Sequence, residues 1–390
     1  MNKNRNIFPK LYQGPTIWLL LKVTDGCNLK CKYCYCKQKG SCKKMSFSTA
    51  KKSVDYFLNK FKNFKYFCIS FSGGESLLNF DVIRKTVFYA QKKAKRTLFG
   101  GELLFQLYTN GVLLSPAINK FLFRNGFLIR ISIDGPDYIH NAYRKFANGE
   151  GSYNIVMANA IALLKLYKTK NMERRITINS VFSPRLLNIQ ERIAHFVKCG
   201  FKSYIMAPTS SAPNTEFFFS VKDMDRFFNE YSKLIRWGIQ QASMGWQKKS
   251  LRDKLYGFFP FLWKMPLGAP LKLYYPFCGA GVTSFAVLPN RNIYSCHVLA
   301  EENRGKVGNI INGIDNKMQM LYKHNDVDSR KECQKCSIRY SCGGGCLAEN
   351  GEIYDNFFKP SKIWCDYIKR HSALDSKLYA KLSKKLIEIN

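Results

Sequence analysis

Three cysteines near the start of the chain have the spacing of iron-sulfur ligands. Cys27, Cys31 and Cys34 form a CxxxCxxC motif. Thiolates are the usual protein ligands of iron-sulfur clusters, and three of them leave one iron of a four-iron cluster without a protein ligand. Such an iron can bind and activate a small molecule, whereas a closed cluster mainly carries electrons. The motif therefore predicts a catalytic cluster, with a zinc site as the alternative.

Strand-like segments predict where these residues lie. Residues 17–23 are apolar and lead through Asp25 and Gly26 into the cysteine motif. This placement indicates chemistry just past the end of a strand, as is usual in α/β folds. Three later strand-like runs also end in polar turns, namely Gly73-Gly74-Glu75, Thr109-Asn110-Gly111 and Ser132-Ile133-Asp134-Gly135-Pro136.

With these motifs the chain resembles the radical S-adenosylmethionine (SAM) enzymes over nearly all its length. The resemblance implies that Cys27, Cys31 and Cys34 hold a 4Fe-4S cluster whose open iron chelates SAM. An electron from a donor such as flavodoxin or ferredoxin then releases a 5'-deoxyadenosyl radical. The resemblance implies further SAM contacts at Tyr33, Gly73, Gly74, Glu75, Thr109, Asn110, Ser132, Asp134 and Arg144.

The chemistry of several contacts suits these roles. Tyr33 would lie beside the adenine, and Glu75 would meet the methionine ammonium. Arg144 would hold the carboxylate and Ser132 the ribose or carboxylate. Glycines at 73 and 74 would permit a close backbone approach. The sequence identifies no catalytic side chain.

A second group of cysteines resembles the SPASM extension, which binds two auxiliary iron-sulfur clusters. The group comprises Cys278, Cys296, Cys333, Cys336, Cys342, Cys346 and Cys365. A zinc ribbon is the alternative, although zinc does not need seven thiolates. Family pairing implies an outer cluster closed by Cys333, Cys336, Cys342 and Cys365. The inner cluster would be held by Cys278, Cys296 and Cys346.

Two closed four-iron clusters need eight ligands, one more than this group offers. An open iron in the inner cluster would bind a substrate thiolate and favour thioether chemistry. The alternative is an eighth ligand from among Cys36, Cys42, Cys68 and Cys199. The group also departs from its family at Arg291, where Gly is usual. We expect the Asn-rich turn around Arg291 to reach the same backbone shape.

Alternating strand-like and helical segments predict an α/β fold with a parallel sheet. The strands are expected at 17–23, 66–71, 103–107, 127–131, 176–182 and 204–206. The helices between them are expected at 49–62, 80–95, 116–125, 153–167 and 187–198. The resemblance implies a partial (β/α)6 radical SAM barrel followed by a small cysteine-rich SPASM domain. A doubly wound sheet is the alternative.

We expect three regions: the barrel at 1–215, a helical linker at 216–270, and the auxiliary domain with a C-terminal helix at 271–390. Residues 221–244 read as a long helix, residues 246–276 as an irregular bridge, and the final helix starts at Asp366. No segment has the length of a signal peptide or membrane span. Fourteen cysteines without an export signal favour a reducing compartment, the cytoplasm.

Radical SAM enzymes with a SPASM extension act mostly on peptides or proteins. The resemblance therefore implies maturation of a ribosomally synthesised peptide through a thioether or carbon-carbon cross-link. Anaerobic sulfatase maturation, which forms formylglycine, is the alternative, and only Asp253 matches the aspartate base of those enzymes. The 26 residues before Cys27 are too few for a leader-binding domain, so the barrel, the basic surface or a separate protein would read a leader.

The net charge of +35 permits a third interpretation. Such a field attracts anions, including nucleic acid, acidic peptides and lipid surfaces. A basic nucleic-acid-binding iron-sulfur protein would explain the charge, but no RNP, KH or zinc-finger motif is present. Lysines recur along the whole chain, and charge dispersed over the surface is the alternative explanation.

Overall fold

The computed structural model describes residues 16–36, 43–98, 100–209, 216–243 and 278–387. The chain forms two compact units. The first comprises residues 1–132, 141–176 and 278–325, and the second comprises 133–140, 177–277 and 326–390. The three predicted regions remain a prediction. Cys42, Asp253 and the bridge at 246–276 lie outside the described residues.

The first unit is built on a mixed sheet in the order β10-β9-β8-β7-β1-β2-β3-β4. β1 to β4 pair in parallel, and β7 pairs in parallel with the other edge of β1. β8, β9 and β10 continue antiparallel. The strands are β1 Thr16–Thr24, β2 Tyr66–Gly73, β3 Glu102–Thr109, β4 Leu128–Ser132, β7 Ser284–Val287, β8 Asn292–Tyr294, β9 Lys306–Asn309 and β10 Gly313–Ile314.

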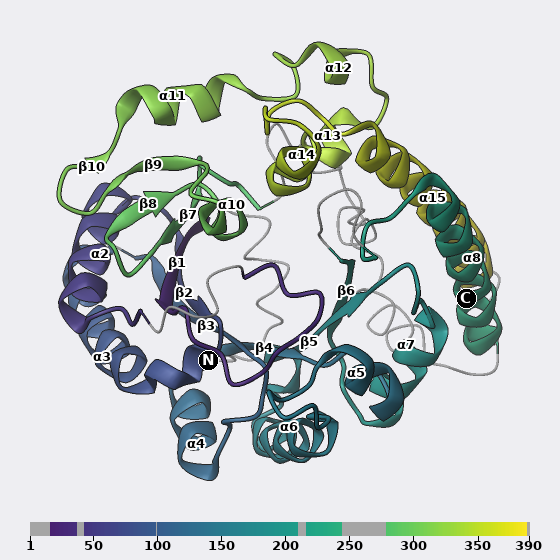
Figure 1. The fold of residues 1–390 in the computed structure, drawn as a ribbon, viewed down its shortest axis with the longest axis horizontal. Helices are drawn as coiled ribbons and strands as arrows, with labels where there is room; N and C mark the ends of the chain where they lie inside the picture. Colours follow the sequence, from purple (N-terminus) through teal and green to yellow (C-terminus); the bar gives the residue numbers. More distant parts are fainter. Residues whose placement is uncertain (1–15, 37–42, 99, 210–215, 244–277, 388–390) are drawn as a thin grey trace. The chain divides into compact units, whose positions relative to one another are not determined.

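Helices α2, α3, α4 and α6 lie along one face of the parallel strands of this unit (Figure 1). Ser46 caps α2 by accepting from the Thr49 N–H at 3.1 Å, and Ser115 caps α4 ahead of Pro116. The helices are α2 Phe47–Lys60, α3 Phe80–Thr97, α4 Pro116–Arg124, α6 Tyr153–Lys168, α10 His297–Glu301 and α11 Asn316–His324, with short 3-10 turns η1 Ser76–Asn79 and η2 Glu173–Arg175. Helix α5 Asp137–Tyr143 has residues in both units.

The second unit holds the parallel strands β5 and β6 and the remaining helices. Phe227 of the long helix α8 stacks on Phe182 at 5.2 Å between ring centroids and also meets Tyr367 of α15. The elements are β5 Ile176–Phe182, β6 Tyr204–Pro208, α7 Ile189–Lys198, α8 Val221–Ser243, α12 Lys331–Gln334, α13 Arg339–Cys342, α14 Leu347–Ile353 and α15 Lys362–Ile387.

The α/β class is confirmed, and all six predicted strands are present in their predicted places. β1 is buried along almost its whole length, as a strand flanked on both edges should be. The long helix expected from 221 is α8, whereas the final helix begins at Lys362, earlier than predicted. Arg291 has a φ of 68°, which confirms that its turn reaches the left-handed backbone shape. Among the described helices, none combines the length and apolarity that crossing a membrane requires.

Candidate functional site

The three cysteines of the CxxxCxxC motif lie in the loop that follows β1. Among the described residues, no three His, Cys, Asp or Glu side chains lie close enough together to hold a metal ion. The pKa of Cys27 is raised to about 11, first by burial and then by the nearby Glu75, Cys31 and Cys34. In the absence of a cation, burial and the neighbouring acidic groups therefore favour the neutral thiol of Cys27 over the thiolate. Metal binding deprotonates such cysteines, because the thiolate is the ligand.

Gly73 and Gly74 hold this loop against the end of β2. A Cβ on Gly74 would lie 2.4 Å from the carbonyl oxygen of Gly26, and one on Gly73 would lie 2.3 Å from that of Thr24. The N–H of Gly74 donates to the Thr24 carbonyl at 3.0 Å, and that of Glu75 donates to Gly26 at 2.8 Å. Gly73 and Gly74 are thus needed because the backbone just before Cys27 packs closely against them.

Glu75 is buried, and both of its carboxylate oxygens accept hydrogen bonds from the protein. Oε1 accepts from the Leu77 N–H at 3.0 Å and from the Thr109 hydroxyl at 2.8 Å. Oε2 accepts from the Asn110 N–H at 2.6 Å. Burial raises the pKa of Glu75, although these donors oppose the rise. Glu75 therefore joins the ends of β2 and β3, and its role toward the methionine ammonium remains a prediction.

Residues 143–145 run beside the cysteine loop and bring two predicted SAM contacts together. The Lys30 N–H donates to the Lys145 carbonyl at 2.8 Å, and the Lys32 N–H donates to the Tyr143 carbonyl at 3.1 Å. Between these contacts, the Arg144 guanidinium lies 5.3 Å from the centre of the Tyr33 ring. Arg144 is only 6% exposed. Its position at the loop is consistent with the predicted role at the SAM carboxylate.

Ser132 and Asp134 differ in their surroundings. Ser132 is the last residue of β4 in the first unit. Asp134 belongs to the second unit and is fully buried, and its Oδ1 accepts from the Val181 N–H at 2.9 Å. Its carbonyl oxygen accepts from Ser180 and Arg192. These hydrogen bonds anchor Asp134 to other residues of its own unit. Its contact with SAM remains a prediction.

Comparison with known proteins identifies the domain that carries this site. Residues 21–197 match the model of the Radical SAM superfamily. These residues form a radical SAM domain. This domain belongs to a class of enzymes whose cofactors are SAM and a 4Fe-4S cluster.

Two relatives differ in how much of the chain they cover. An uncharacterized protein of Methanocaldococcus jannaschii is 34% identical over 185 residues, which are 47% of this chain and 60% of that protein. The match thus spans less than two thirds of that relative. A cysteine-type anaerobic sulfatase-maturating enzyme of Clostridium novyi is 25% identical over 374 residues, covering 90% of this chain and 92% of that enzyme.

Two solved structures share the fold. Native anSMEcpe with bound AdoMet has a TM-score of 0.73 at 21% identity and covers 95% of this chain and 100% of that chain. Streptococcus suis SuiB bound to precursor peptide SuiA has a TM-score of 0.59 at 15% identity and covers 91% and 77% of the two chains. At these identities the likeness concerns the fold.

The donor set of the radical SAM domain suits the expected cluster, because three cysteines lie in the loop after β1. Gly73 and Gly74 leave no room for a side chain against the backbone ahead of that loop. Cys36 is buried beside Cys34, and the hydrogen bond between these two thiols raises the pKa of Cys36 well above its ordinary value. Cys68 is instead part of the β2 core, and Cys199 lies at the end of α7 beside His195.

Four cysteines of the second group belong to the second unit and influence one another electrostatically. The pKa of Cys333 is raised to about 11, first by burial and then, against the effect of Arg330, by Cys342, Cys365 and Cys336. These are the four ligands that family pairing implies for the outer auxiliary cluster. Of the predicted inner ligands, Cys278 and Cys296 belong to the first unit and Cys346 to the second.

A buried ionic network beside the cysteine loop was not predicted. Lys22 of β1 forms ion pairs with Asp25 at 2.7 Å and with Glu301 at the end of α10. All three side chains are buried. The sequence signal for this network is a lone lysine within the otherwise apolar segment 17–23.

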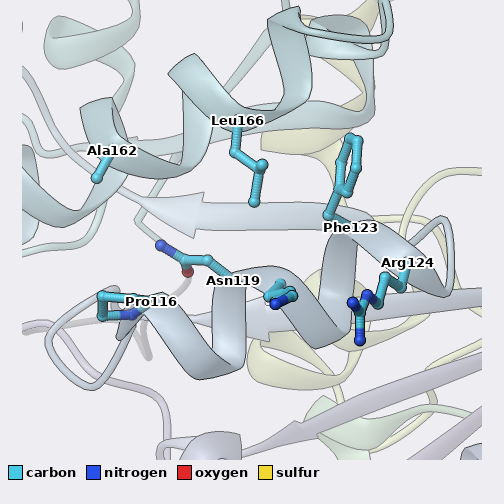
Figure 2. A pocket seen from close by; sticks show the side chains of 7 residues that line it. Pro116, Asn119, Phe123, Arg124, Ala162 and Leu166 are labelled. Atoms are coloured by element: carbon cyan, nitrogen blue, oxygen red, sulfur yellow. The ribbon is translucent and has the colours of Figure 1, made fainter.

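A separate groove of about 450 Å³ lies between α4 and α6 (Figure 2). None of the predicted site residues lines it. The lining residues are Pro116, Asn119, Lys120, Phe123, Arg124, Ala162 and Leu166.

Proposed function

We propose that this radical SAM enzyme modifies a peptide or protein, and that its reaction is the maturation of a ribosomally synthesised peptide by a thioether or carbon-carbon cross-link. The observation that carries the radical chemistry is the placement of Cys27, Cys31 and Cys34 in one loop directly after β1, within the radical SAM domain. The likeness of the fold to SuiB, solved with its precursor peptide, supports a peptide substrate.

When bound, the cluster and SAM would supply the radical chemistry needed to remove a hydrogen atom from the substrate. The chain positions them. Gly73 and Gly74 fix the backbone ahead of the cysteine loop, and Glu75 ties that turn to the end of β3. Tyr33 and Arg144 would lie against the adenine and carboxylate of SAM.

The second cysteine group would hold two auxiliary 4Fe-4S clusters, and the chemistry these clusters would supply is electron acceptance or relay. An open iron held by Cys278, Cys296 and Cys346 would bind a substrate thiolate and so favour a thioether product. We further propose that flavodoxin or ferredoxin is the electron donor. A leader would be read by the barrel, by the basic surface or by a separate protein. We also propose a cytoplasmic location. The cysteine-rich composition supports that location.

Sulfatase maturation is the second candidate function. It is supported by the Clostridium novyi enzyme, whose similarity extends over 92% of its length. The two reactions differ in the fate of sulfur. A thioether cross-link removes two hydrogens and keeps the cysteine sulfur, whereas formylglycine formation from cysteine releases it. Mass spectrometry of a cysteine peptide from a gene adjacent to this one, and of a sulfatase peptide, therefore separates the two functions.

Individual substitution of the triad tests the radical chemistry. Cys27→Ala, Cys31→Ala and Cys34→Ala should each abolish 5'-deoxyadenosine formation in the presence of dithionite, because each removes a ligand of the SAM cluster. Cys199→Ala is the matched control, since Cys199 belongs to neither cysteine group, and should keep normal turnover. A triad variant that cleaves SAM at the normal rate would overturn the assignment. A protein that only binds nucleic acid would form no 5'-deoxyadenosine at all.

A further inference from the structure

Asn110 directly follows β3 and contacts the cysteine loop. Its side-chain Nδ2 donates to Asn28 Oδ1 at 2.7 Å and to the Cys27 Sγ at 3.7 Å. The side chain is 7% exposed. Asn110 is therefore a buried donor to one of the three cluster cysteines.

The orientation of this amide follows from its partners. The Val112 N–H can only donate, and it lies 3.0 Å from the Asn110 Oδ1. The oxygen must then face Val112, and the NH2 group must face Asn28 and Cys27. An amide NH2 has two hydrogens, and these two acceptors use both. The side chain thus has no N–H left for SAM, in contrast to the contact that the sequence predicts for Asn110.

The main chain fixes Asn110 as firmly as its side chain does. Its own N–H donates to Glu75 Oε2 at 2.6 Å, which ties the residue to the glutamate of the Gly-Gly-Glu turn. The Cys27 sulfur also accepts from the Leu29 N–H at 3.4 Å. Two N–H groups therefore point at one sulfur, one from the loop itself and one from the turn after β3.

Hydrogen bonds to the sulfurs are among the factors that set the reduction potential of an iron-sulfur cluster. A donor stabilises negative charge on the sulfur, and this stabilisation is greater in the reduced cluster, which carries one more electron. Removal of the donor should therefore lower the potential and make the cluster harder to reduce.

We propose that Asn110 is a positioning residue that orients the Cys27 sulfur and raises the reduction potential of the SAM cluster. The proposal rests on the proposed function, in which Cys27 is a ligand of that cluster. It assigns the turn after β3 a role in electron uptake and not in holding SAM.

Two variants and one control test this role in the full-length protein after anaerobic reconstitution. Asn110→Ser keeps a side-chain oxygen for the Val112 N–H but cannot reach Cys27, and Asn110→Leu removes all side-chain hydrogen bonds at similar size. Asn159→Ala is the matched control, because Asn159 donates to the carbonyls of Gly111 and Val112 and not to sulfur. The measurement is an EPR-monitored redox titration without SAM. The signal of the SAM cluster is the one that a Cys27→Ala, Cys31→Ala, Cys34→Ala triple variant lacks.

The Asn110→Ser protein should retain the cluster signal, while its reduction equilibrium shifts about tenfold toward the oxidised form. For one electron this shift is about 59 mV. The control should titrate like the unsubstituted protein. If the potential is unchanged in both Asn110 variants and only SAM affinity falls, Asn110 is a SAM contact and the proposal is overturned. If no signal depends on the triad, the proposed function itself fails, which is a different result. If only the Asn110→Leu protein loses the cluster, the potential measured for the Asn110→Ser protein decides whether the proposal holds.

Discussion

Lys22 is a buried cation held between two carboxylates, and its removal should be costly. Lys22→Met would leave Asp25 and Glu301 buried without their counter-charge, and breaking a buried pair in this way costs about 3–5 kcal/mol. Urea unfolding of the apoprotein measures the loss. Lys51→Met is the matched control, because Lys51 pairs with Asp55 at the exposed surface, and it should change stability little.

The same lysine gives a pH dependence of defined sign. Burial alone would lower the pKa of Lys22, but hydrogen bonds and charges from Asp25 and Glu301 raise it. Because the folded pKa lies above the unfolded value of about 10.4, the stabilisation is complete below that pH and is lost as pH rises through the folded pKa. Lys22→Met should therefore lose less stability than the unsubstituted protein when the pH is raised above this value. An identical alkaline decline in both proteins would contradict the buried network.

Glu75 should matter to the fold as well as to the cofactor. Glu75→Ala leaves the N–H groups of Leu77 and Asn110 without their acceptor, at about 1–3 kcal/mol for each buried group. We expect lower thermal stability, weaker SAM binding by calorimetry, and retention of the cluster iron, since the cysteines remain. Unchanged SAM affinity would show that the turn is only structural.

The residue scale also shows what a single sequence could and could not reveal. The spacing of Cys27, Cys31 and Cys34 is local, so the motif could be recognised from the sequence without knowledge of the fold. The network of Lys22 with Glu301 joins residues far apart in the chain, and no local pattern encodes such a pair. The contact of Asn110 with Cys27 was missed for the same reason: only the parallel sheet brings the ends of β1 and β3 to one edge.

At the element scale, the six strands of the βα repeat were predictable because each is an apolar run bounded by turn residues. β7 to β10 were not predicted. They are two to four residues long, too short for a periodic signal. The pairing of β7 with β1 is likewise a long-range contact that the sequence pattern does not specify. The early start of α15 at Lys362 lies within the usual uncertainty of helix ends.

A substitution in the turn between β7 and β8 should stabilise the protein. Arg291 has a φ of 68°, and the left-handed conformation costs a residue with a Cβ about 1–2 kcal/mol. Arg291→Gly should therefore raise the free energy of unfolding by about 0.5–1 kcal/mol after the greater flexibility of glycine in the unfolded chain is subtracted. Asn171→Gly, at a φ of 52°, is the control and should gain less, because Asn tolerates this conformation. Equal gains at the two positions would contradict this explanation.

For the whole molecule, the iron content decides between one cluster and three. Anaerobic reconstitution should give about twelve irons per chain if the second cysteine group holds two 4Fe-4S clusters. Cys333→Ala combined with Cys365→Ala should reduce this content by about four irons, because both are among the four ligands that family pairing implies for the outer cluster. Cys68→Ala is the control from the β2 core. Tightly bound zinc in place of iron would instead support the zinc-ribbon alternative.

The parallel pairing of β7 with β1 also has a consequence for synthesis of the chain. Trp18 pairs with Ser284, so one edge of the first strand has no partner until most of the protein has left the ribosome. At 5–20 residues per second, that interval is on the order of 10 to 50 s. During it, β1 presents unpaired N–H and C=O groups beside a row of apolar side chains, the combination that promotes association between nascent chains. Translation speed and chaperone supply, more than the stability of the finished protein, should then determine how much soluble enzyme a cell obtains.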